Sequence, residues 1–224
     1  MNNILFNKND YLYGFKLDID LSAISKSCIT INNLVNNKYA PITKMVKEIA
    51  KKQIELNKEN NPVFFNNMKK FYYWYLHTYY GSYNIFTFPF EGIIELYREI
   101  KKCFKLVDFR NENFYMEGWA NVLEKNKINK IDWHSHFHES LKTWHGYFCI
   151  NVNKTKTFYR IPGVDGEVAV EGESNLLVLA RGDGDEHCTE IWKKENEPRI
   201  TIGLNIVPEK SIDPEVWFNH WVPL

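Results

Sequence analysis

The second half of the chain is a series of short extended runs that leave no room for helices between them. After Val107 there are eight such runs, rich in β-branched and aromatic residues and mostly separated by turn-forming residues. This spacing is typical of a β-sandwich or barrel. Eight strands favour a double-stranded β-helix, or jelly roll, built from two Greek keys. The predicted strands are Phe114–Leu123, Lys130–His138, Trp144–Val152, Thr155–Ile161, Val168–Val170, Asn175–Ala180, His187–Trp192 and Arg199–Val207.

Residues 1–107 instead carry helical spacing. Amphipathic helices are predicted from Pro41, after Pro62, and over Glu91–Leu106. The very aromatic stretch 71–90 is predicted to be a helix face packed on a sheet, with the wall of a substrate pocket as the alternative. We therefore expect one mainly β domain, residues 1–224, in which an N-terminal helical layer (1–107) braces a jelly-roll catalytic core (108–224).

Composition excludes several classes of protein. The 224 residues include 28 basic and 28 acidic side chains, so the chain lacks the basic field of non-specific nucleic-acid binders, and a nucleic-acid partner is not expected. No apolar run approaches the roughly 18 residues of a membrane span. The start, MNNILFNKND, lacks the pattern of a signal peptide, and the four cysteines are scattered. These features predict a cytoplasmic protein, of a bacterial cell or a phage-infected host.

Three histidines alternate in the second predicted strand. His134, His136 and His138 share one face, because successive side chains of a strand point to opposite sides. Imidazoles gathered in this way are good metal ligands. The alternative is a solvated polar face. The opposite face is apolar or small and is expected to bury against the helical layer; its members are Ile131, Trp133, Ser135 and Phe137.

A further ligand is predicted at the start of the seventh strand. His187 follows the glycine-rich turn at 181–186, and in a jelly roll the second and seventh strands lie side by side. We expect His134, His136 and His187 to hold the metal, with His138 in reserve. A histidine satisfied by water in a turn is the alternative for His187. Cys188 faces the opposite way and is expected to pack in an apolar environment.

The eighth predicted strand has one apolar and one polar face. Ile200, Ile202, Leu204 and Ile206 alternate with Arg199, Thr201, Gly203 and Asn205. An arginine that begins an inward face is costly unless it meets an anion, and its planar fork suits a carboxylate, with the Thr201 hydroxyl beside it. A structural salt bridge at the strand end is the alternative.

Together these residues resemble the Fe(II)/2-oxoglutarate-dependent oxygenases. The resemblance covers the C-terminal half, is greatest to phage and marine-bacterial members, and rests on WHSHFHE, on the twelve residues from His187 to Arg199, and on the Arg199-Ile200-Thr201 signature. It implies iron(II) bound by the predicted histidines and 2-oxoglutarate bound by Arg199, with Thr201, Tyr147 or Tyr159 assisting. Dioxygen would decarboxylate the co-substrate and oxidise a small molecule or peptide, most simply by hydroxylation.

One position departs from the family pattern. The family places an aspartate or glutamate two residues after the first histidine, and this chain has His136 or His138 there. Asp132 and Glu139 are carboxylates at other spacings. Two other interpretations stay open: a three-histidine cupin dioxygenase that does not use 2-oxoglutarate, and a non-catalytic jelly-roll module for binding or structure. The closing aromatic cluster is expected to fold back on the barrel, with a homodimer contact as the alternative; it comprises Trp217, Phe218 and Trp221.

Overall fold

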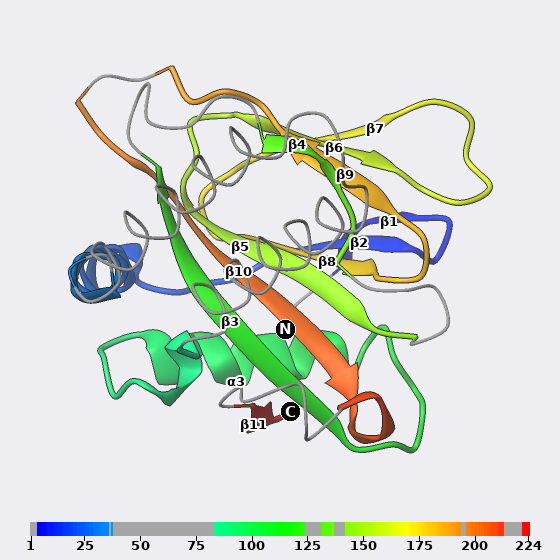
Figure 1. Ribbon diagram of the computed structural model, residues 1–224, viewed down its shortest axis with the longest axis horizontal. Helices are drawn as coiled ribbons and strands as arrows, with labels where there is room; N and C mark the ends of the chain where they lie inside the picture. Colours follow the sequence, from blue (N-terminus) through cyan, green and yellow to red (C-terminus); the bar gives the residue numbers. More distant parts are fainter. Residues whose placement is uncertain are drawn as a thin grey trace, which may run out of the picture.

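The strands form two sheets that face each other. The computed structural model describes residues 4–35, 37, 83–123, 131–136, 142–193, 196–212 and 221–224. The larger sheet has the order β1-β2-β8-β5-β10-β3-β11 and the smaller the order β4-β9-β6-β7 (Figure 1). Their bounds are β1 Ile4–Lys8, β2 Leu12–Lys16, β3 Phe114–Leu123, β4 Ile131–His134, β5 Trp144–Asn151, β6 Lys156–Arg160, β7 Val168–Glu171, β8 Leu176–Arg181, β9 Glu186–Thr189, β10 Arg199–Pro208 and β11 Val222–Pro223.

All eight predicted strands are present, and the predicted jelly roll is confirmed. In the larger sheet the predicted strands follow the order β8-β5-β10-β3, which are the sixth, third, eighth and first of the eight predictions. In the smaller sheet they follow the order β4-β9-β6-β7, which are the second, seventh, fourth and fifth. This is the strand order of two interlocked Greek keys. The second strand is shorter than predicted, since β4 ends at His134.

The helical prediction for residues 1–107 is wrong at the N-terminus. There β1 and β2 form a hairpin, and β2 extends the larger sheet by pairing with β8. Asn9 and Asp10 both have positive φ, 53° and 51°, as the mirror-image turns of tight hairpins require. Leu12, Tyr13 and Phe15 are all buried, so β2 has apolar contacts on both faces and lacks the polar alternation that marks a strand.

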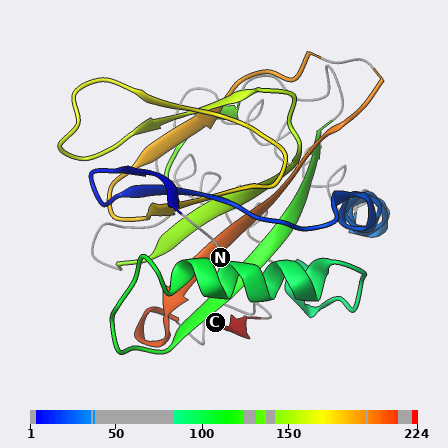
Figure 2. The same cartoon turned by 180° about the vertical axis from the view of Figure 1, so that it is seen from behind.

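Helix α3, Ile93–Phe104, covers the outer face of the larger sheet, and a second helix, residues 21–35, stands at the side of that sheet (Figure 2). Helix α3 lies within the predicted segment 91–106. The helices predicted from Pro41 and after Pro62 lie outside the described residues. In the part of the chain that the structure describes, no helix has the length and apolar character needed to span a bilayer. The buried side chains of α3 are Ile93, Leu96, Ile100, Cys103 and Phe104.

The described part of the aromatic stretch packs in the core. A short 3₁₀ helix, η1, spans Ile85–Thr87. Phe86, Phe88 and Phe90 contact the same apolar cluster as α3, and Tyr83 accepts a hydrogen bond from the Ala120 amide in β3. This agrees with core packing; residues 71–82 lie outside the described residues.

The two faces of β10 separate as predicted. Ile200, Ile202, Leu204 and Ile206 join the cluster that includes α3. The alternate residues face the smaller sheet, so the polar groups of β10 lie inside the barrel. A second apolar cluster lies between the sheets; its fully buried members include Leu12, Cys149, Val178, Tyr159 and Ala180.

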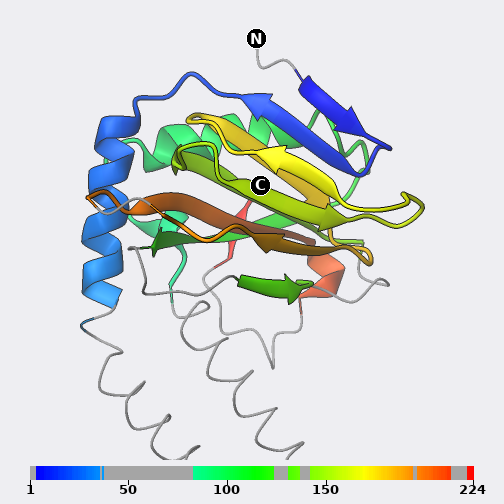
Figure 3. The ribbon, with the colours of Figure 1, turned by 90° about the horizontal axis from the view of Figure 1, so that it is seen from above.

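The predicted packing of Trp133 on the helical layer is wrong. The guanidinium of Arg160 lies over its ring, 3.9 Å from the centroid, and the two belong to the smaller sheet. Trp133 lines a cavity of about 540 Å³ together with Phe158, Cys188 and Trp192. The reason is topological, because α3 packs on the larger sheet and β4 lies on the opposite side of the barrel (Figure 3). Cys188 packs away from the barrel interior, as predicted.

The core makes a direct prediction about stability. Phe148 in β5 is fully buried between α3 and the sheet. Phe148→Ala should lower the free energy of unfolding by about 3–5 kcal/mol, because it removes a large apolar side chain and leaves a cavity. The matched control is Phe109→Ala, at a phenylalanine that is 85% exposed, where a change within about 0.5 kcal/mol is expected. Equal effects of the two changes in urea unfolding would contradict this packing.

Candidate metal and anion site

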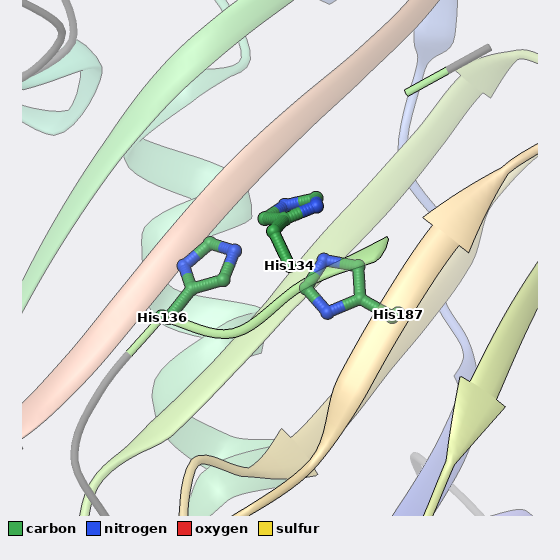
Figure 4. A group of neighbouring side chains, drawn as sticks. All are labelled: His134, His136 and His187. Carbon is green, nitrogen blue, oxygen red and sulfur yellow. The ribbon is translucent and has the colours of Figure 1, made fainter. Parts of the chain in front are cut away.

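Three of the predicted ligands lie together at one end of the barrel. β4 and β9 pair with His134 directly opposite His187. The ring centroids of His134 and His187 are 4.3 Å apart, and His136 lies 5.4 Å from the first and 5.1 Å from the second (Figure 4). One nitrogen of each ring lies within 4.8 Å of the others. The structure thus brings the predicted trio together; His138 lies outside the described residues.

Burial keeps the inner two imidazoles neutral. His134 is exposed, His136 is half-buried and His187 is 9% exposed, so the trio opens toward solvent on the His134 side. Burial, followed by the neighbouring imidazoles, lowers the pKa of His136 well below its ordinary value. Burial also lowers the pKa of His187 to about 4, against the opposing effect of Asp185. Neutral imidazoles are the form that binds metals.

A carboxylate missed in the sequence lies behind His187. Asp185 is 1% exposed, accepts a hydrogen bond from Nε2 of His145 at 2.7 Å, and has its Oδ2 3.7 Å from Nδ1 of His187. Burial opposes its charge, but the charges and hydrogen bonds of the two histidines hold the pKa of Asp185 well below its ordinary value. Ligand atoms of His145, Asp185 and His187 form a second group within 4.8 Å. The sequence signal was the two-residue spacing of Asp185 and His187, which places both on one face.

A second polar chain, also missed, reaches His136 from the larger sheet. Nδ1 of His136 lies 2.8 Å from Oδ1 of Asn205, and Nδ2 of Asn205 donates to Oε1 of Glu117 at 2.9 Å. Trp119 stacks on His136, with centroids 6.0 Å apart and an interplanar angle of 18°. Gly203 makes room for that ring, since a Cβ there would lie 2.7 Å from the Trp119 side chain.

Arg199 is buried inside the barrel beyond the histidines. It is 4% exposed, and its Nε donates to the Thr155 hydroxyl at 3.2 Å, while its Nη1 lies 3.5 Å from the Thr201 hydroxyl. Burial lowers the pKa of Arg199. Among the described residues no carboxylate forms an ion pair with it, so the alternative of a structural salt bridge finds no support there.

Two tyrosines lie between the histidines and Arg199. Tyr159 pairs with His187 across β6 and β9, with ring centroids 5.6 Å apart. Tyr147 pairs with Gly203 across β5 and β10, one position from Thr201 along the inner face. Both hydroxyls are buried. They lie near each other, and that of Tyr147 also lies near Thr157, but neither makes a hydrogen bond of normal geometry with a described residue. Burial raises the pKa of both phenols. They are neutral donors in an otherwise closed interior.

Comparison with known proteins gives structural similarity only. No family model and no curated protein matches the chain. Similar solved structures include a Pseudomonas putida prolyl-4-hydroxylase (TM-score 0.40, 11% identity, 53% of this chain and 64% of that one). They also include the non-haem α-ketoglutarate-dependent carbocyclase SnoK from nogalamycin biosynthesis (0.34, 13%, 43% and 50%) and the non-haem monooxygenase ThoJ, solved with nickel (0.35, 8%, 43% and 45%).

The similarity is partial in length. The match spans between 45% and 64% of each of these three structures. The class predicted from the sequence, the Fe(II)/2-oxoglutarate-dependent oxygenases, is represented among them.

The buried imidazoles predict how stability depends on pH. The pKa of His187 is about 4 in the folded chain and about 6.5 when unfolded. As the pH falls from about 6.5 to about 4, the unfolded chain therefore binds a proton that the folded chain excludes. The free energy of unfolding of metal-free protein should fall over this window, by at most about 1.4 kcal/mol per pH unit for His187. His136 acts in the same direction.

The control for this effect is His187→Gln, which removes one titrating group and keeps a polar side chain. Urea unfolding with a chelator present should show a shallower pH dependence in this variant than in the wild type. Identical slopes would show that His187 is not protected from protons in the folded state.

Proposed function

We propose that the chain is a non-haem Fe(II)/2-oxoglutarate-dependent dioxygenase that hydroxylates a small-molecule or peptide substrate. One observation carries the proposal: three imidazoles converge at the barrel mouth, and a buried guanidinium on the same interior has no carboxylate partner among the described residues. An uncompensated buried cation is costly unless a ligand anion completes its site.

The residues fit a metal in ligand type and in protonation state. Imidazole nitrogen suits iron(II), and burial keeps His136 and His187 unprotonated at neutral pH. His134, His136 and His187 would hold the ion.

The interior also fits a dicarboxylate co-substrate. Arg199 offers a planar set of donors, and Thr155 and Thr201 already lie against it. The buried hydroxyls of Tyr147 and Tyr159 add two neutral donors between Arg199 and the histidines. A diacid that reached from the metal to the guanidinium would satisfy groups that are otherwise unpaired.

The proposed roles divide between chemistry and positioning. When bound, iron(II), 2-oxoglutarate and dioxygen would supply the oxidation, by coupling decarboxylation of the co-substrate to oxidation of a substrate C–H bond. Arg199 binds the distal carboxylate and Thr201 orients the guanidinium. Tyr159 and Tyr147 donate hydrogen bonds and close the interior to water. The exposed His134 side leaves the approach for the substrate.

A second candidate is a three-histidine cupin dioxygenase that does not use 2-oxoglutarate. The absence of a carboxylate from the His134–His136–His187 group favours it. The buried Arg199 counts against it, because such an enzyme has no diacid to bind. A non-catalytic jelly roll is the third reading, and it predicts that no metal binds.

The test is the dependence on 2-oxoglutarate. Arg199→Gln should weaken 2-oxoglutarate binding by about 30-fold or more, since the loss of one partner from a buried charge pair costs about 2–5 kcal/mol. Iron(II) affinity should stay within about twofold, because the hydrogen bonds of Arg199 to described residues go to Thr155 and Thr201 and not to His134, His136 or His187. Anaerobic calorimetric titration and succinate formation measure the two effects.

The matched control is Arg98→Gln, at an exposed arginine of α3. It should leave 2-oxoglutarate binding unchanged. Turnover of the wild type without 2-oxoglutarate would favour the cupin, and purified protein with no affinity for iron would favour the non-catalytic module.

A further inference from the structure

We propose that two carboxylates act one layer outside the ligand trio, which itself includes no carboxylate among the described residues. In this inference Asp185 and Glu117 are positioning residues, each acting on one imidazole from behind, and they hold His187 and His136 with Nε2 as the ligand atom. The inference rests on the metal site of the proposed function. It assigns roles to residues that were predicted neither as metal ligands nor as part of the 2-oxoglutarate site.

The chain of contacts behind His136 fixes its tautomer. A carboxylate accepts hydrogen bonds and does not donate them, so Glu117 turns the Nδ2 group of Asn205 toward itself. The Asn205 oxygen therefore faces His136 and must accept, and Nδ1 of His136 must carry the proton. The lone pair of a neutral ring with that tautomer is on Nε2.

Asp185 acts on His187 from the residue just before β9, the strand that carries His187. Its Oδ2 lies 3.7 Å from Nδ1 of His187, too far for a hydrogen bond but close enough for the charge to favour an N–H over a lone pair at that atom. Nε2 of His145 donates to the same oxygen at 2.7 Å and keeps the carboxylate in place. His145 and Asp185 are both at most 2% exposed, so solvent does not screen the interaction.

The geometry favours a position behind the ring over direct ligation. Nδ1 and Nε2 lie on different edges of an imidazole, and Asp185 is on the Nδ1 edge. Figure 4 shows the His187 ring with one nitrogen toward His134 and the other turned away from it. Carboxylates in this relation to a metal-bound histidine fix its orientation and raise its basicity, and their loss costs about 10- to 100-fold in metal affinity.

The first experiment uses metal-free wild-type protein, so it does not depend on metal binding. Long-range ¹H–¹⁵N spectra at about pH 8, above the ordinary imidazole pKa, distinguish the two neutral tautomers. We expect His136 and His187 with the proton on Nδ1, and His145 with the proton on Nε2. A proton on Nε2 of His136 or of His187 overturns the inference, whatever the protein binds.

The second experiment titrates cobalt(II) into three variants. Asp185→Asn should weaken binding by about 100-fold and shift the His187 tautomer toward Nε2–H, because the new amide presents a donor to Nδ1. Glu117→Gln keeps an acceptor for Asn205 and removes only the charge, so about a 10-fold loss with an unchanged His136 tautomer is expected. Glu186→Gln, at the half-exposed neighbour of His187 that pairs with Arg160, should bind like the wild type.

The outcomes separate the two proposals. Wild-type protein that does not bind cobalt(II) or iron(II) refutes the proposed function, while the tautomers still test the positioning roles. If the wild type binds metal and Asp185→Asn and Glu117→Gln bind within about twofold of it, the positioning inference fails and the metal site stands. If either variant unfolds, its amide ¹H–¹⁵N spectrum shows this. The tautomers of His136 and His187 in the wild-type protein then decide whether the inference holds.

Discussion

The pairing of β4 with β9 is the constraint on which the site depends. It places His134 opposite His187 and, with His136 close by, gathers imidazoles from stretches about fifty residues apart. Because strand side chains alternate, a slip of one residue would turn His134 outward and Trp133 inward. The packing of Trp133 under Arg160 on the outer face, and of Cys188 beside Phe158, opposes that slip. The packing of the outer face therefore fixes the register of β4 against β9, and with it the positions of the inward histidines.

The barrel interior contains both polar groups that are hydrogen-bonded within the protein and polar groups that are not. Most of its buried polar groups are matched inside the protein, as in Asn205 with Glu117 and Asp185 with His145. The phenols of Tyr147 and Tyr159 are not matched among the described residues, and Arg199 meets only hydroxyls there. Among the buried polar atoms without a hydrogen-bond partner in the described residues, the hydroxyls of Tyr147 and Tyr159 lie between the histidines and Arg199, where a bound diacid would pair with them.

The alternation of side chains along each strand was enough to predict the strands and the faces of their residues. The eight strands, the two faces of β10 and the inward direction of His134 and His187 all follow from a period of two. β2 was not predicted as a strand, because both of its faces are buried and its sequence does not alternate. Trp133 was predicted to pack on the wrong layer, because alternation separates the two faces of a strand but does not say which layer covers each face. Asp185, Asn205 and Glu117 were missed as positioning residues for a different reason. Alternation gives the face on which Asp185 and Asn205 lie, but it does not give the contacts that they make with side chains of other strands.

The substitution of an imidazole for the usual carboxylate has a physical consequence for the interior. Three imidazoles occupy as many coordination positions as two imidazoles and a carboxylate, so the number of positions left for other ligands is the same. The charge differs, because an imidazole does not carry the negative charge of a carboxylate. In the proposed site a metal dication and the Arg199 guanidinium would share one interior, and anions would have to stabilise both. Asp185, behind His187, would supply part of that charge without occupying a coordination position, and a dianionic co-substrate would supply the rest.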